Sequence, residues 1–273
     1  MPELPEVETV VRALRPKVVG RTIEKVRVNW ARHIATPDVP VFEAHLQNVK
    51  IEALTRRAKY IVFKLDSGET MLVHLKMTGH LSVVAAERPV GKYDHTVFEL
   101  DGDEELRFRD PRKFGKVHLL DDPEVVLGKL GPEPLLDDFT VAVFKERLEG
   151  RSRQLKPLLL DQTFIAGVGN IYADEALHHA HLHPLRRANS LSEVDIVNLH
   201  EAVRHVLRLG IAREGASIDQ YVKPDGSKGD MQNAVAVFRR TGHPCYTCGT
   251  PISRIVVGGR STHFCSQCQS APE

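Results

Sequence analysis

Residues 60–75 read YIVFKLDSGETMLVHL. Two runs rich in apolar and β-branched residues flank the turn signal Asp66-Ser67-Gly68, which is typical of two strands joined by a tight turn. Similar short runs, separated by turn residues, follow one another from Thr22 to Leu120. The sequence therefore predicts a β-sandwich. Its expected strands cover residues 22–28, 49–54, 60–65, 70–75, 95–100, 105–109 and 116–120.

Helices are expected on both sides of this β region. Before it, Pro5 suits the first turn and Gly20 follows the end of a helix over residues 5–18. The apolar face of that helix comprises Val7, Val10, Val11, Leu14 and Val18. Beyond Gly131-Pro132-Glu133-Pro134 the apolar spacing is again helical. There Ser190-Leu191-Ser192-Glu193 predicts a capping box that opens a helix with Val194, Val197, Val203, Val206 and Leu207.

The four cysteines stand near the end of the chain, as Cys245-x-x-Cys248 and Cys265-x-x-Cys268. This spacing is typical of a zinc ribbon, in which four thiolates bind one ion; two disulfides are the alternative. The sequence has no apolar signal segment and no run of about 18 apolar residues. We therefore expect a cytoplasmic protein, in which disulfides are rare. Four cysteine ligands leave no open position for water, so one structural Zn²⁺ is predicted.

These patterns together predict an α+β, multidomain chain. An N-terminal helix and β-sandwich are expected over residues 1–133, a helical domain over residues 134–236 and a zinc finger over residues 237–273. The formal net charge is only +1, but residues 231–272 contain no Asp or Glu. Arginines in that segment predict a basic surface for phosphates.

The N-terminus suggests covalent chemistry. Residues 2–9 read Pro2-Glu3-Leu4-Pro5-Glu6-Val7-Glu8-Thr9, behind Met1. A small second residue permits removal of Met1, which leaves Pro2 as a free secondary amine. An α-amino group titrates near ~8 and lysine near ~10.4, so far more of the terminal amine is unprotonated at neutral pH. Such an amine can form a Schiff base, with Glu3 as a proton donor; the alternative is an ordinary chain start.

Two loops have features of nucleic-acid binding. Asp110–Gly115 places Arg112 and Phe114 on a loop, and proteins that kink DNA insert such side chains. Gly167-Val168-Gly169 leads into an expected helix, whose backbone NH groups can hold a phosphate. For each loop taken alone, an ordinary turn is the better interpretation.

These stretches occur in the order found in one family. They are Pro2–Thr9, Arg56–Tyr60, His74–Gly79, Asp110–Gly115, Ala166–Tyr172 and the zinc ribbon with Gly258–Cys265. Over essentially its full length, the chain resembles the bacterial formamidopyrimidine-DNA glycosylases. The resemblance implies a β-sandwich, a helix-two-turn-helix domain and a zinc finger, with damaged double-stranded DNA as the partner. It further implies a monomer that acts on nucleoid DNA in the cytoplasm, without a membrane.

The resemblance also implies a reaction. Pro2 attacks C1′ of the damaged nucleotide, expels an oxidised purine such as 8-oxoguanine or a formamidopyrimidine, and forms the Schiff base. Glu3 is the acid for base loss and ring opening. Lys59 serves proton transfer in β-elimination and contacts phosphate, whereas Arg260 assists δ-elimination. The zinc ion orients Arg260 through its ligands, which are Cys245, Cys248, Cys265 and Cys268.

Further residues are implied to contact DNA. Met77, Arg112 and Phe114 match the residues that fill the gap left by an extruded base. Asn170 matches an asparagine that holds phosphate.

The chain departs from the family pattern at three places. Tyr93 stands where the family often has a histidine, so a phenol contacts the phosphate. Where the family often has a lysine, this chain offers Arg153 or Arg151. Residues 215–232 correspond to the loop that covers the extruded base, and Asp219 stands where the family often has an arginine.

Two other functions stay open. One is an endonuclease VIII-like glycosylase for oxidised pyrimidines, although Leu4 and the three gap-filling residues favour the purine branch. The other is a zinc-ribbon DNA-binding protein without catalysis, which forms no imine with DNA.

Overall fold

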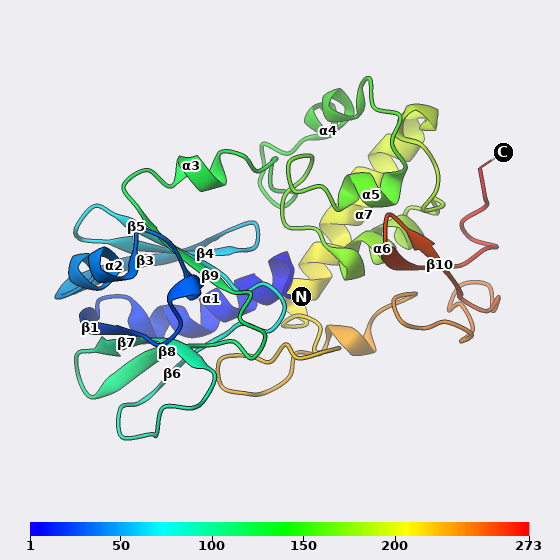
Figure 1. Cartoon of the computed structure of the whole chain (residues 1–273). Coiled ribbons are helices and arrows are strands. Elements are labelled where there is room, and N and C mark those ends of the chain that lie inside the picture. Colours follow the sequence, from blue (N-terminus) through cyan, green and yellow to red (C-terminus); the bar gives the residue numbers. More distant parts are fainter. Residues whose placement is uncertain (273) are drawn as a thin grey trace. The chain divides into compact units, whose positions relative to one another are not determined.

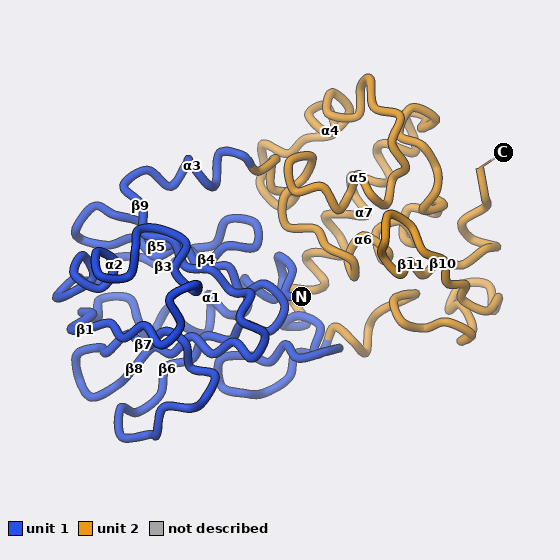
Figure 2. Tube along the Cα trace, viewed as in Figure 1, with its two compact units in different colours: residues 1–129, 213–230 blue, residues 130–212, 231–273 orange. Residues whose placement is uncertain are grey.

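The computed structural model describes residues 1–272. They form two compact units (Figure 2): unit 1 comprises residues 1–129 and 213–230, and unit 2 comprises residues 130–212 and the chain from residue 231 onward. The segment 213–230 thus follows a helix of unit 2 but packs with unit 1. The three domain ranges expected from the sequence stay predictions.

Unit 1 is built on one nine-stranded sheet with the order β2-β9-β5-β4-β3-β1-β7-β8-β6. The strands are β1 Thr22–Val28, β2 Ile34–Thr36, β3 Val49–Arg57, β4 Tyr60–Leu65, β5 Thr70–His74, β6 His80–Ala85, β7 Asp94–Leu100, β8 Glu104–Arg109 and β9 Lys116–Leu120. The helices of this unit are α1 Leu4–Val18, the 3-10 turn η1 Ala31–His33, α2 Val39–His45 and α3 Glu124–Leu127.

The sheet folds into two layers because its halves meet through a very short pairing. β1 pairs with β3 only at Thr22↔Lys50 and Ile23↔Val49. Figure 1 shows β3, β4, β5 and β9 in one layer and β1, β7, β8 and β6 in the other. α1 packs against strands of both layers, and one apolar core contains residues such as Val11, Phe63 and Phe98. The predicted β-sandwich with an N-terminal helix is therefore confirmed.

Seven of the nine strands of this sheet were predicted, and β2 and β6 were not. β1, β4 and β9 have the predicted bounds, and β3, β5, β7 and β8 differ only at their ends. β6 was missed because Leu81 is the single buried residue of this edge strand, so its sequence shows no clear alternation.

Unit 2 combines helices with a C-terminal hairpin. The helices are α4 Val141–Leu148, α5 Leu155–Leu159, α6 Asn170–His179 and α7 Glu193–Ala212, with 3-10 turns η2 Ala188–Ser190 and η3 Met231–Asn233. The hairpin consists of β10 Ser253–Val257 and β11 Arg260–Phe264, and β11 packs on α6. α6 and α7 approach closely at Gly210, where a Cβ atom would lie 2.5 Å from the Tyr172 ring.

The predicted helix α7 is present, but its capping box lies two residues later than predicted, so the helix begins at Glu193. Ser192 Oγ accepts the Asp195 N–H at 3.2 Å, and Asp195 Oδ2 accepts the Ser192 N–H at 2.9 Å. Ser190 instead donates its hydroxyl to the Arg187 carbonyl at 2.8 Å, because it belongs to the preceding 3-10 turn. Val194 and Val197 are also exposed, whereas Val203, Val206 and Leu207 are buried as predicted.

Replacing Ser192 by Ala should therefore destabilise the unit that contains α7. Loss of an N-cap side chain costs about 1 kcal/mol of unfolding free energy. Urea denaturation followed by circular dichroism measures this loss. Ser190→Ala is the matched control and should cost less than half as much; the reverse order would contradict the assignment of the cap to Ser192.

Candidate active site and metal centre

Pro2 directly precedes a rigid helix start. Glu3 is the N-cap of α1 and forms a capping box with Glu6, in which the Glu3 N–H donates to Glu6 Oε2 at 2.8 Å. Pro2, Glu3 and Glu6 are all buried. The backbone next to Pro2 is therefore held in place, and two carboxylates lie at the positive end of the helix dipole.

Glu6 also holds part of the segment 213–230. Its Oε1 accepts the Ala216 N–H at 2.7 Å. The Tyr221 hydroxyl lies 3.4 Å from the Glu6 carbonyl oxygen and 3.2 Å from that of Glu214. Burial, and then the charge of Glu6, raise the pKa of Tyr221, so its hydroxyl stays a donor. The start of α1 and this segment are thus joined within unit 1.

Lys59 lies in the turn between β3 and β4. Its side chain is buried, and Ala58 before it adopts a φ of 52°. Across the β4–β5 pair, Tyr60 stands opposite His74, with their rings edge to face at 4.8 Å. The predicted lysine therefore sits in a tight turn, directly before a tyrosine that pairs with His74.

His74 is a candidate site residue to which sequence reasoning assigned no role. Burial, and then the charges of Lys76 and Lys59, lower its pKa to about 3, so the ring is neutral at physiological pH. Its Nδ1 accepts the Lys76 N–H at 3.0 Å, which leaves the proton on Nε2. A neutral N–H donor between two lysines suits a phosphate oxygen. The sequence signal was its position in the expected hairpin of residues 60–75, where it stands opposite Tyr60, the residue that follows Lys59.

The three predicted gap-filling side chains are exposed on two connected loops. Met77 and Phe114 are 40% and 48% exposed, and the Arg112 guanidinium lies 4.9 Å from the Phe114 ring centre. The Arg112 N–H donates to Thr78 Oγ1 at 3.2 Å, which joins the loop after β5 to the loop after β8.

A buried carboxylate holds these two loops together. Asp110, with no exposed surface, accepts the Thr78 hydroxyl, the Arg112 N–H at 3.2 Å and the Gly115 N–H at 2.6 Å. The Asp110 N–H in turn donates to the Tyr93 carbonyl at 2.9 Å. Tyr93 therefore belongs to the same arrangement, and its ring lies 5.1 Å from the Arg109 guanidinium.

In unit 2, Asn170 connects α6 to the hairpin strand β11. The turn before it contains Gly167 with a φ of 94°, and Asn170 is the first residue of the helix. Its Nδ2 donates to the Ser261 carbonyl at 3.0 Å, next to Arg260. Arg260 is exposed at the start of β11. The helix start and the predicted arginine are thus neighbours within one unit.

A second contact holds the same strand. Asp174, one turn further along α6, accepts the His263 N–H at 3.0 Å and lies 3.1 Å from His263 Nδ1. Its other oxygen pairs with Lys156, whose side chain is fully buried. Lys156 is therefore a structural cation that helps to hold β11 on α6.

Arg151 and Arg153 were the two residues considered for a phosphate contact, and they differ in their interactions within the protein. Arg153 is 52% exposed and pairs with Asp161 at 2.8 Å. Arg151 lies over the Phe164 ring and donates to the Arg147 carbonyl at 2.7 Å. Arg153 is the more accessible of the two, which favours it for phosphate contact.

The four cysteines gather at the base of the hairpin. Cys248 Sγ lies 3.4 Å from Cys265 Sγ and 3.5 Å from Cys268 Sγ, and Cys245 Sγ lies 3.9 Å from Cys268 Sγ. A tetrahedral Zn²⁺ with bonds of about 2.3 Å separates its sulfur ligands by about 3.8 Å. The cysteines carry no disulfide, and among residues 1–272 they are the one group able to hold a metal ion. The site therefore fits one structural Zn²⁺, as predicted.

Comparison with known proteins accounts for this arrangement. Three family models match: the formamidopyrimidine-DNA glycosylase N-terminal domain over residues 1–117, the formamidopyrimidine-DNA glycosylase H2TH domain over residues 130–222, and a zinc finger found in FPG and IleRS over residues 242–271. The chain belongs to the formamidopyrimidine-DNA glycosylase family. The resemblance inferred from sequence motifs is thereby confirmed.

Individual members of the family are similar in sequence to this protein along its whole chain. The formamidopyrimidine-DNA glycosylase of Herpetosiphon aurantiacus is 48% identical over 273 residues, which cover 99% of this chain and 100% of that protein. That of Symbiobacterium thermophilum is 47% identical and covers 100% of this chain and 90% of its own.

Solved structures of the same family are similar in fold. A Lactococcus lactis FPG mutant in complex with Fapy-dG containing DNA has a TM-score of 0.93 and 37% identity, over 99% of this chain and 100% of that one. Lactococcus lactis Fpg with an abasic site containing DNA has a TM-score of 0.92 and 37% identity, over 98% and 100%. Separately, none of the helices within residues 1–272 is long and apolar enough to cross a membrane.

The metal site yields a direct test. We expect one equivalent of zinc in the purified protein, and Cys248→Ala should lose it and unfold the hairpin region, while unit 1, which contains no cysteine, stays folded. Elemental analysis and circular dichroism measure both effects. Ser266→Ala, an exposed position between Cys265 and Cys268, should retain the metal. Less than about half an equivalent of zinc in folded wild-type protein would contradict the assignment.

Proposed function

We propose that this base-excision-repair glycosylase removes oxidised purines from double-stranded DNA through a Schiff base on Pro2, and then cleaves the strand as an AP lyase. The observation that carries the proposal is the N-terminus of α1. Pro2 directly precedes the capping box of Glu3 and Glu6, which fixes the backbone at the start of α1. A nucleophile needs such a rigid support.

The reaction starts with the chain from which Met1 has been removed. The lone pair of the Pro2 nitrogen attacks C1′ of the lesion nucleotide, and the bond from C1′ to the base breaks. The departing base is neutralised by a proton as the Pro2 nitrogen gives up its own, and the C1′–O4′ bond then breaks while Glu3 protonates O4′, which leaves an iminium between Pro2 and C1′. This chemistry requires the nucleotide to leave the stack, which costs a few kcal/mol.

Other residues act before and after base loss. Met77, Arg112 and Phe114 fill the vacated position, because they are exposed on loops that Asp110 holds together. Lys59 serves proton transfer in β-elimination, and Arg260 assists δ-elimination.

Phosphate contacts come from both units. We assign them to Tyr93 and His74 in unit 1, and to Asn170 and Arg153 in unit 2. In this proposal residues 1–133, 134–236 and 237–273 serve as catalytic, helical DNA-binding and zinc-finger domains, and the protein acts as a monomer on DNA in the cytoplasm. The structures of Lactococcus lactis relatives with damaged DNA support this choice of partner.

The nucleophile can be tested by borohydride trapping on DNA with an abasic site. Protein without Met1 should form a covalent adduct, and protein that retains Met1, as verified by mass, should form none because its Pro2 nitrogen is an amide. Glu3→Gln keeps the amine, so it should still be trapped on abasic DNA while base excision slows about 100-fold. Full trapping of protein that retains Met1 would refute the role of Pro2.

The substrate class can be tested by competition between two duplexes. One carries 8-oxoguanine opposite cytosine, and the other carries an oxidised pyrimidine. We expect faster single-turnover excision of 8-oxoguanine, followed by a one-nucleotide gap. Faster excision of the pyrimidine would assign the chain to the endonuclease VIII-like specificity. Absence of any imine on either duplex would point to a DNA-binding protein without catalysis.

A further inference from the structure

Residues 213–230 form a closed loop on unit 1, here called the 213–230 loop. Its two arms meet at the base, where the Asp230 N–H donates to the Arg213 carbonyl at 2.7 Å and their side chains form an ion pair at 2.5 Å. A Cβ atom at Gly229 would lie 2.3 Å from the carbonyl oxygens of Glu214 and Gly215. Only glycine therefore allows the arms to approach this closely.

The first arm, residues 213–222, lies beside the N-terminus of α1. Its Ala216 N–H donates to Glu6, and Glu6 accepts the N–H of Glu3, the residue next to Pro2. Whatever binds at Pro2 is therefore close to this arm, and the position of the arm affects the geometry at Pro2.

The tip of the loop is held by a histidine of the sandwich. The Lys223 N–H donates to the Ser227 carbonyl at 2.8 Å, and the Gly226 N–H donates to the Lys223 carbonyl at 2.8 Å, so residues 223–227 form a tight turn. His80, the first residue of β6, donates from Nε2 to the same Lys223 carbonyl at 3.0 Å. A carbonyl only accepts, so the proton resides on Nε2.

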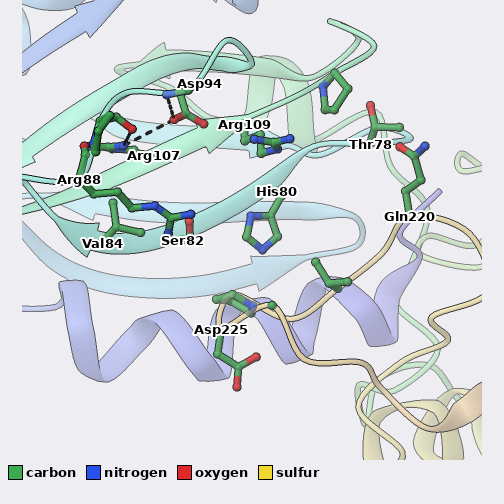
Figure 3. A pocket seen from close by; sticks show the side chains of 16 residues that line it. Thr78, His80, Ser82, Val84, Arg88, Asp94, Arg107, Arg109, Gln220 and Asp225 are labelled. Atoms are coloured by element: carbon green, nitrogen blue, oxygen red, sulfur yellow. Dashed lines mark hydrogen bonds and ion pairs between the residues drawn. The ribbon is translucent and has the colours of Figure 1, made fainter.

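This hydrogen bond lies beside an open cavity, which is lined by His80 and by residues of the loop. A space of about 600 Å³ separates the strands from the loop, and Figure 3 shows His80 and Ser82 facing it from the sheet, with Gln220 and Asp225 on the loop side. At the tip, Pro224 is buried but Asp225, Gly226 and Ser227 are exposed and add little packing, so the directional contact from His80 matters for the position of the turn. Burial lowers the pKa of His80, which keeps the ring in the neutral donor form.

We propose that His80 is a positioning residue for base removal: it latches the tip of the 213–230 loop, and thereby holds the first arm of that loop beside Pro2. The proposal rests on the proposed glycosylase function. His80 follows Met77 by three positions, so the latch also links the loop to the gap-filling region. Removing the latch should impair excision of a base that the loop must hold, and should spare strand cleavage at a pre-formed abasic site.

The test compares His80→Phe, which keeps a flat ring without an N–H donor, with His80→Gln, which restores an N–H donor at a similar reach. His80→Phe should lower the single-turnover rate of 8-oxoguanine excision about three- to tenfold, the effect of one neutral hydrogen bond. Cleavage of abasic DNA should stay within about twofold. His80→Gln should recover most of the loss, and Ser82→Ala, which lines the same cavity, should resemble the wild type.

A second readout does not depend on activity. Lys228 is exposed on the loop, whereas cleavage after Lys223 is blocked by Pro224. Trypsin should therefore cut after Lys228 faster in His80→Phe than in the wild type or His80→Gln, as followed by mass spectrometry of native protein. Equal cutting of the wild type, His80→Phe and His80→Gln would overturn the latch. So would an equal loss of activity of His80→Phe on both DNA substrates. A wild-type protein inactive on both substrates would refute the proposed function, while the trypsin comparison would still decide the latch.

Discussion

The carboxylate of Glu6 joins two segments of unit 1 that are more than two hundred residues apart in the sequence. One oxygen accepts the Glu3 N–H and the other accepts the Ala216 N–H, both from a buried position. Hydrogen bonds to a charged group contribute about 1.5–3 kcal/mol each, and removing a partner leaves a buried charge unsatisfied. The Glu6 side chain therefore joins the backbone beside Pro2 directly to the 213–230 loop.

The same physical device recurs where other functional loops are held. Asp110 collects the N–H groups of Arg112 and Gly115 beneath the gap-filling side chains. In unit 2, Glu175 accepts three successive N–H groups from residues 236–238, and Asp174 holds β11. Buried carboxylates thus accept hydrogen bonds from backbone N–H groups that no helix or strand pairs. The exposed side chains of the loops remain available for DNA.

Much of the chain is determined by local sequence. α1, β1, β4 and β9 follow from apolar periodicity and turn residues within a few positions, and the four zinc ligands follow from two short spacings. Pro2 and Glu3 were named from the chemistry of a terminal secondary amine, and Lys59 and Arg260 from family motifs; neither argument shows the surroundings of these residues. The capping box of α7 was misplaced because Ser190 and Ser192 carry the same local signal, and only the helix geometry distinguishes them.

Tertiary structure alone decided the contacts between distant segments. The sequence could not show that Lys156 is fully buried against Asp174, or that the segment 213–230 packs with unit 1. His80 meets the Lys223 carbonyl across 143 positions, and Ala216 meets Glu6 across 210. Periodicity reports which face of an element is apolar, because burial acts on each residue separately. A hydrogen bond between two loops depends on where the whole fold brings both backbones, and no local pattern contains that information.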